Sequence, residues 1–331
     1  MEKKIDGGWF TISIDFELNW GVRDSKTLKQ YGPNILGGRA AIPQILALFE
    51  RKNIHATWAI VGMLACENKD EIYSLWPQKK PSYKDSKLNP YETFHQVGKN
   101  EIDDPFHFGR SLVKQIADTP HMEIASHSFS HYYCLEPNID QGAFKADVAA
   151  SLQALEQYNK RVSSFVFCRN QFAEDDLLVL SELGFEVFRG NESASIYAPK
   201  AKTRLPGIRR AARFLDSYIN VTGSNTVGGL QRVHGVLNAP SSRFLRPYYN
   251  DFSEDLKVRR ILNAMKYASA NNEGFHIWWH PHNFGFDIEK NLESLRLIID
   301  YYQFLRDEYG MRSVNMAELP KFIDKKVENL C

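Results

Sequence analysis

The sequence predicts an α/β fold built on a mostly parallel sheet, either open or closed into a barrel. Short apolar runs alternate with amphipathic helices over about 300 residues, and this alternation is typical of βα units. Polar residues follow several of the apolar runs, where parallel sheets place their functional sites. The chain has 331 residues, 43% of them hydrophobic, which suits one large core better than a string of small modules.

Short apolar runs predict the strands. The first lies at 9–16, and the second, at 55–61, is closed by Gly62. Four further runs complete the set that we expect in the main sheet: 122–125, 163–167, 185–188 and 275–279. Because helical stretches separate these runs, they predict parallel pairing of the strands.

Apolar residues that recur every three to four positions predict the intervening helices. Residues 140–159 form one, and acidic side chains at 174–176 occupy the first turn of another, where they favour helix formation. Three further apolar stripes mark helix faces: Ile42, Ile45, Leu46 and Phe49; Val258, Ile261, Leu262 and Met265; and Leu295, Ile298, Ile299 and Tyr302.

We expect a single domain over 1–331, with loop excursions at about 66–120 and 190–250. Proline breaks the pattern in the first excursion, and glycine and proline break it in the second. Long segments of this kind inside a domain are usually functional covers or disordered. Their many aromatic residues favour ordered covers.

Composition narrows the classes of partner. Lys plus Arg total 41 and Asp plus Glu total 40, so a formal charge of +1 predicts no general attraction to nucleic acid or anionic membranes. No run approaches 18 apolar residues, and the first residues resemble no secretory signal, so we expect neither a membrane span nor export. Four scattered cysteines without a CxxC pair suggest a reduced, cytoplasmic protein: Cys66, Cys134, Cys168 and Cys331.

Two histidines, His127 and His131, follow the strand at 122–125. Their i, i+4 spacing lets them share one face of a helical turn, where neutral imidazoles can hold one cation. Two surface histidines at chance spacing are the alternative.

Asp15 and Glu17 end the first strand, and alternation places both on one side of it. One carboxylate can then bind a metal while the other takes a proton, although a solvated strand end is the commoner fate.

Arg169 follows the strand at 163–167 and could hold Asp15 ionised, or it could be an ordinary exposed arginine. His280 follows the last strand and is a candidate acid for a leaving amine. His282, with Asn283 beside it, is the rival acid, and a packed core histidine is the alternative to both.

Taken in order, these segments resemble the polysaccharide deacetylase superfamily of the carbohydrate esterase family four type, with a nodulation-deacetylase-like domain. The match at 123–131, which includes Ser126-His127-Ser128-Phe129-Ser130-His131, is very like the metal motif of that superfamily and is the most specific. The segment 235–242 resembles a strand of its members that act on surface polysaccharides such as O-antigen. Motif-like segments also occur at 13–17, 55–62, 167–172 and 279–281, so the resemblance covers roughly 9–285.

The resemblance implies a distorted parallel (β/α) barrel of about seven strands. It implies that Glu17, His127 and His131 bind Zn²⁺ or a similar divalent ion, that Asp15 is the base oriented by Arg169, and that His280 is the acid. Further residues that could contact substrate or support the site are Trp20, Phe172, His282 and Asn283. Glu17 stands where an Asp ligand is usual, and the arginine motif lacks its proline.

We therefore expect a cytoplasmic, metal-dependent carbohydrate N-deacetylase acting on an N-acetylated sugar, either nucleotide- or lipid-linked, in lipopolysaccharide biosynthesis. One alternative is a metal-independent hydrolase of small cyclic amides or ureides, because some relatives with an acid–x–acid motif bind no metal. Another is a glycan-binding barrel without catalysis. A basic cluster at Arg204, Arg209, Arg210 and Arg213 could hold a diphosphate, although a solvated helix face is the more common role.

Overall fold

The computed structural model describes residues 6–158, 160–198 and 207–324. Its sheet has the strand order β6-β7-β5-β4-β3-β2-β1-β9-β8, with β10 paired to β1. Among the named strands of the described residues, β6 and β7 form the only antiparallel pair; two isolated antiparallel bridges join Asn68 to Asn100 and Val227 to Gly274. The strands are β1 (Trp9–Phe16), β2 (Ala56–Ile60), β3 (Met122–Ser126), β4 (Ser164–Val166), β5 (Val187–Arg189), β6 (Gln231–Val233), β7 (Val236–Asn238), β8 (Arg243–Phe244), β9 (Gly274–Trp279) and β10 (Arg312–Ser313).

Strand β1 is an interior strand of this sheet, between β2 and β9. All eight of its residues are buried, as expected for a parallel strand covered on both faces. The α/β class and the distorted parallel barrel are confirmed, in the form of a curled half-barrel. The described part of the sheet has ten strands where about seven were expected, because β6, β8 and β10 are pieces of two or three residues that leave no periodic signal.

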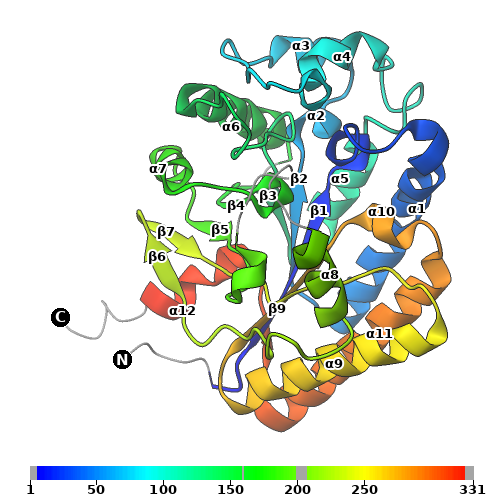
Figure 1. Cartoon of the computed structure of the whole chain (residues 1–331), viewed down its shortest axis with the longest axis vertical. Helices are drawn as coiled ribbons and strands as arrows, with labels where there is room; N and C mark the ends of the chain where they lie inside the picture. Colours follow the sequence, from blue (N-terminus) through cyan, green and yellow to red (C-terminus); the bar gives the residue numbers. More distant parts are fainter. Residues whose placement is uncertain (1–5, 159, 199–206, 325–331) are drawn as a thin grey trace.

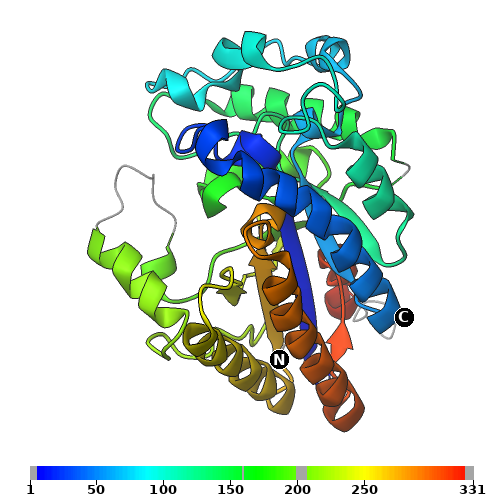
Figure 2. The same ribbon diagram turned by 90° about the vertical axis from the view of Figure 1, so that its right-hand side faces the viewer.

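Helices cover the sheet, and α1, α9 and α11 pack together along one side of it (Figures 1 and 2). A capping box at Thr27 begins α1, and Asn53, in the left-handed conformation, ends it. The helices are α1 (Leu28–Lys52), α2 (Gly62–Ala65), α3 (Lys69–Ser74), α4 (Pro90–Thr93), α5 (Arg110–Asp118), α6 (Gln141–Glu156), α7 (Glu174–Glu182), α8 (Gly207–Asp216), α9 (Asp251–Ala270), α10 (Pro281–Phe284), α11 (Ile288–Tyr309) and α12 (Pro320–Asp324).

The two excursions contain more regular structure than the sequence predicted. The segment 66–120 holds α3, α4 and α5, and the first two lie together at the top of Figure 1. The segment 190–250 holds α8 and three short strands, of which β7 pairs with β5 and β8 pairs with β9. This second segment therefore extends the sheet as well as covering it. No helix among the described residues combines the length and apolarity needed to cross a membrane.

Candidate active site

The carboxyl ends of five strands bring polar side chains together at one edge of the sheet. Asp15 lies near the end of β1, and Arg189 is the last residue of β5. His127, Cys168 and His280 follow β3, β4 and β9 within one or two residues. This is the edge where open parallel sheets place their ligands.

Glu17 is the centre of the cluster. Its Oε2 lies 3.0 Å from His131 Nε2 and 3.5 Å from His127 Nε2. Its Oε1 lies 3.6 Å from His280 Nε2 and 4.0 Å from His282 Nε2. Burial alone would raise the pKa of Glu17, but the imidazoles, His280 foremost, hold that pKa well below its usual range. One ionised carboxylate therefore sits among four imidazoles.

The loop that carries His127 and His131 is held by Asp147 of α6. Asp147 is fully buried and accepts hydrogen bonds from the backbone N–H groups of Phe129 and Ser130 and from the Ser130 hydroxyl. The loop is not the helical turn that the i, i+4 spacing suggested, because Ser128 and His131 have φ values of 58° and 57°. Left-handed residues fold the segment back, so the two imidazoles still converge on Glu17.

The donor atoms of this cluster fit a divalent cation. His127 Nδ1 donates to the carbonyl of Val166 at 2.8 Å, which leaves the Nε2 lone pair directed away from that bond. Nε2 is buried and makes no hydrogen bond of normal geometry to any residue within the described ranges. An orphaned imidazole nitrogen beside a carboxylate and a second imidazole is the donor set that Zn²⁺ and similar ions take.

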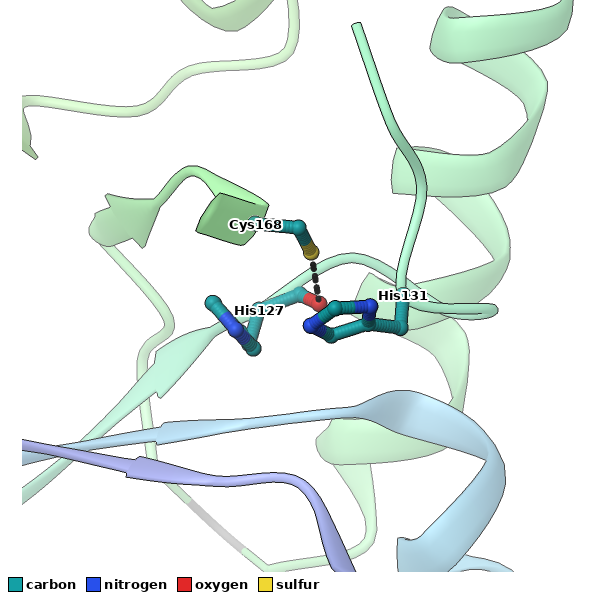
Figure 3. Close-up of side chains that lie close together, drawn as sticks. All are labelled: His127, His131 and Cys168. Carbon is teal, nitrogen blue, oxygen red and sulfur yellow. Dashed lines mark hydrogen bonds between the residues drawn. The ribbon is translucent and has the colours of Figure 1, made fainter. Parts of the chain in front are cut away.

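Cys168 is a further candidate metal ligand that the sequence motifs did not predict. Figure 3 shows its sulfur beside His127 and His131, and one ligand atom from each of the three residues lies within 4.8 Å of the others. The thiol contacts the carbonyl of His127 at 3.4 Å. Burial alone would raise the pKa of Cys168, but the two imidazoles lower it to about 5. In sequence, the only sign was its place one residue before Arg169.

Arg189, rather than Arg169, pairs with Asp15. Its Nη1 donates to Asp15 Oδ1 and its Nη2 to Oδ2, both at 2.7 Å, and the two side chains are 0% and 3% exposed. Nη1 also donates to the Ser13 hydroxyl. Burial alone would raise the pKa of Asp15, but the charge of Arg189 outweighs it and lowers that pKa. The guanidinium that pairs with Asp15 was expected from Arg169, and Arg189 at the end of β5 supplies it instead.

Arg169 is held elsewhere, which corrects the expectation that it orients Asp15. Its Nη2 lies 2.5 Å from Asp24 Oδ2, and its guanidinium stacks 3.8 Å from the centre of the Tyr133 ring. Its backbone has a φ of 58°, so the chain turns sharply where β4 ends. An acidic partner and an aromatic face therefore fix Arg169 on the wall of the cavity.

His280 is better placed than His282 to act on a substrate. Its Nε2 lies 3.8 Å from Asp15 Oδ2, and its side chain is 21% exposed. Its Nδ1 meets Asn283 Oδ1 at 3.2 Å. His282 stacks on the His280 ring and is nearly enclosed, and burial together with the charge of His280 lowers its pKa to about 3. His282 is therefore a neutral neighbour at physiological pH.

A cavity of about 520 Å³ opens onto this cluster. Asp15, Glu17, His131 and His280 line this cavity, and Trp278 and Phe244 supply aromatic walls. His282, Asn283 and Arg169 also line it. Trp20 and Phe172 are not among the lining residues: Trp20 is buried and donates to the carbonyl of His107, and Phe172 packs on Phe167 and Phe188.

Comparison with known proteins finds a family likeness over part of the chain. Residues 31–188 match the family model described as polysaccharide deacetylase. The matched stretch is a little less than half of the 331 residues. The matched stretch includes the loop with His127 and His131, whereas Asp15, Glu17 and His280 lie outside it in sequence and join it in space. No curated protein sequence matches the chain.

Solved structures of deacetylases share this fold. A putative polysaccharide deacetylase from Mycobacterium smegmatis superposes with a TM-score of 0.58 at 12% identity, over 98% of this chain and 96% of that one. A probable polysaccharide deacetylase from Pseudomonas aeruginosa PAO1 gives 0.58 at 11% identity, over 97% and 92%. Puue allantoinase gives 0.58 at 12% identity, over 97% and 92%. At these identities the likeness concerns the fold.

Proposed function

We propose that this protein is a metal-dependent hydrolase of the polysaccharide deacetylase type that removes an N-acetyl group from a sugar or glycan precursor. The observation that carries the proposal is the surroundings of Glu17, whose oxygens lie within 4.0 Å of four imidazole nitrogens. Asp15 and His280 stand next to it, 3.8 Å apart. The cluster thus offers ligands for an ion, a second carboxylate as base and a partly exposed imidazole as acid.

In this proposal, Glu17, His127 and His131 hold the ion, and Zn²⁺ is favoured because mixed carboxylate and imidazole sites suit it. A bound divalent ion supplies Lewis-acid polarisation of an amide oxygen and makes water more acidic. The hydrogen bond from His127 Nδ1 to Val166 fixes the tautomer that ligation by Nε2 needs.

The side chains of Asp15 and His280 carry out the proton transfers. Asp15 accepts the proton of the attacking water, and the two bonds from Arg189 keep its carboxylate ionised and fixed in orientation. His280 then donates a proton from Nε2 to the leaving amine, with its ring oriented by Asn283. Each of the two proton transfers is worth roughly 10²–10⁴-fold in rate.

The substrate that we propose is an N-acetylated sugar joined to a nucleotide or a lipid, a cytoplasmic precursor in lipopolysaccharide or related biosynthesis. The aromatic walls at Trp278 and Phe244 suit the apolar faces of a sugar ring. A cavity of about 520 Å³ is of the size that holds a small ligand, and it supports a short saccharide over a long polymer.

A second candidate is a hydrolase of small cyclic amides or ureides that uses no metal. The observation that favours it is the pairing of Glu17 with His131 at 3.0 Å, which already satisfies the carboxylate without an ion. The shared fold with an allantoinase is consistent with this candidate. The two functions differ in whether activity survives a chelator.

Metal content decides between them. We expect about one Zn²⁺ per purified chain by mass spectrometry, with loss of the ion in Glu17→Gln and His131→Ala and no loss in the surface control His95→Ala. Acetate release from N-acetylated sugars should then stop with a chelator and return with Zn²⁺. A wild-type chain that binds no ion after incubation with Zn²⁺, yet opens cyclic amides, would contradict the proposal. Sugar binding without any turnover would point to a non-catalytic barrel.

A further inference from the structure

The lining of the cavity includes arginine charge that ion pairs do not fully neutralise. Five arginines line the cavity: Arg169, Arg210, Arg213, Arg243 and Arg246. Arg169 pairs with Asp24, and Arg243 pairs with Asp216. The other three form no ion pair with a carboxylate of the described residues. Because the whole chain has a formal charge of only +1, this excess is local.

Three residues on one face of α8 and just beyond it point into the cavity. Arg210, Arg213 and Ser217 are spaced i, i+3, i+7, which places them on the same side of a helix, and all three line the cavity. Figure 2 shows α8 standing apart from the other helices. The basic cluster noted in the sequence is therefore divided: Arg210 and Arg213 face the cavity, Arg209 bonds to the carbonyl of Ser195, and Arg204 lies outside the described residues.

Buried Asp216 anchors this face of α8. Asp216 is 0% exposed and accepts hydrogen bonds from Arg243 at 3.2 Å, Arg260 at 2.8 Å and Tyr197 at 2.9 Å. These bonds connect the end of α8 with β8, α9 and the segment before α8. Arg213, one turn earlier, is consequently set against the cavity rather than free in solvent.

Arg213 and Arg246 are fixed through Nε and leave both terminal nitrogens available. Arg213 Nε donates to the carbonyl of Ile196 at 2.7 Å, and Arg246 Nε donates to the Ser217 hydroxyl at 2.6 Å. Ser217 in turn donates to the carbonyl of Arg213 at 3.1 Å, so the two arginines are joined through one serine. Their Nη atoms make no hydrogen bond to the residues that the structure describes. Two such forks match the paired oxygens of phosphate groups.

Burial without a carboxylate partner is costly for a guanidinium. It lowers the pKa of Arg246 and of Arg213, both of which are half-buried. Glu192 is the acidic group that acts on Arg213 from within the cavity wall, and burial raises the pKa of that carboxyl towards its neutral form. An anionic group brought by a ligand would remove this imbalance.

We propose that Arg213 and Arg246, with Arg210 at the mouth, bind a phosphate or diphosphate group that is linked to the acetylated sugar. The inference rests on the proposed function for the identity of the sugar, but the arginine pair stands on its own geometry. The phosphate-bearing end lies at α8, and the sugar lies on Trp278 and Phe244 towards Glu17 and His280. A neutral glycan would leave the arginines unpaired.

Titration calorimetry of the full chain with inorganic pyrophosphate tests the arginine pair directly. We expect Arg213→Gln and Arg246→Gln each to weaken binding about tenfold, because each removes one charged pair of hydrogen bonds. Arg296→Gln, an exposed arginine on α11, should leave the affinity unchanged. Glu17→Gln should also bind pyrophosphate normally, which separates the arginine site from a metal site. Unchanged affinity in both arginine variants, or loss in Glu17→Gln alone, overturns the proposal.

The lysine variants Arg213→Lys and Arg246→Lys keep the charge but lose the fork, and they cover the case in which a glutamine variant fails to fold. We expect them to bind several-fold more weakly than wild type. Two sugar probes then identify the source of the phosphate: UDP-N-acetylglucosamine for a nucleotide and a short-chain prenyl-diphosphate N-acetylglucosamine for a lipid. Tighter binding of either probe than of a neutral N-acetylglucosamine trimer supports the proposal. If the trimer binds as tightly as the two probes and its affinity is unchanged in the arginine variants, the proposal is contradicted.

Discussion

Arg189 and Asp15 form a bidentate ion pair across the half-barrel, with two hydrogen bonds of 2.7 Å between side chains 174 residues apart in sequence. Strands β5 and β1 are not neighbours in the sheet, so the pair depends on the curl that turns their ends towards each other. The arginine also stacks 4.3 Å from the Trp278 ring. Arg189 therefore connects the candidate base to the aromatic wall of the cavity.

Replacing Arg189 should affect catalysis more than replacing Arg169. In Arg189→Ala, Asp15 becomes a buried carboxylate without its partner, so we expect its pKa to rise and kcat to fall by roughly 10²–10⁴-fold. Arg189→Lys should recover part of the rate, because it restores charge without the fork. Acetate release measured from pH 5 to 9 should show the acidic limb moving to higher pH in Arg189→Ala. A larger loss in Arg169→Ala would return the orienting role to Arg169.

Variants of His280 and His282 should lose different amounts of activity in the acetate-release assay. We expect His280→Ala to lose roughly 10²–10⁴-fold in kcat, because the partly exposed imidazole is the proposed acid. His282→Gln should lose less, since the pKa of His282 is lowered to about 3 by burial and by His280, and the N–H of a neutral imidazole is too weak an acid to protonate the amine. A substrate with an activated leaving group should rescue His280→Ala alone. Equal rescue of both variants would assign the acid differently.

Asp147 is expected to control the shape of the histidine loop. Asp147→Ala leaves two backbone N–H groups and the hydroxyls of Ser130 and Tyr91 without their acceptor, so we expect a loss of about 3 kcal/mol in the free energy of unfolding. Zn²⁺ affinity should fall with it, because His131 would lose its fixed position. Asp147→Asn keeps one acceptor oxygen and should lose less of both. Urea unfolding and a Zn²⁺ titration measure the two effects, and an unaltered Zn²⁺ affinity in Asp147→Ala would exclude the coupling.

The sequence was sufficient to predict the position of the site residues that lie at or just after the ends of strands. Asp15, Glu17, His127, His131 and His280 were all expected at one edge of the sheet, and the structure brings them within a few ångströms of each other. The reason is physical: parallel strands end at the same edge, so a polar residue just after each strand has few other places to go. The order of these segments along the chain then carried the family resemblance, and the family model matches residues 31–188.

What the sequence could not predict depends on curvature and on backbone reversal. Arg169 and Arg189 both lie at strand ends, and only the curl of the sheet decides which of them meets Asp15. Cys168 reaches the histidines through a turn with left-handed residues at 169 and 170, which no periodicity reveals. The position of α8 depends on Asp216, a residue that no motif or periodicity in the sequence distinguishes.

The pH dependence of stability tests the role of Asp216 at the end of α8. Burial alone would raise its pKa, but hydrogen bonds from Thr222 and the charge of Arg243 lower it to about 2, against 3.8 in an unfolded chain. A lowered pKa stabilises the fold above pH 3.8, and this contribution is lost as pH falls from about 4 to about 2. The shift corresponds to about 2 kcal/mol, so Asp216→Asn should lose at least about that much at pH 7.

Urea unfolding at pH 7, 4 and 3 should therefore show the gap between wild type and Asp216→Asn narrowing as the pH falls through that window. Asp255→Asn, an exposed change on α9, should stay close to wild type throughout. Because Asp216 holds the end of α8, pyrophosphate affinity should drop in Asp216→Asn at pH 7 even where the chain remains folded. A constant stability gap at every pH would mean that the Asp216 carboxylate contributes through packing rather than through its charge.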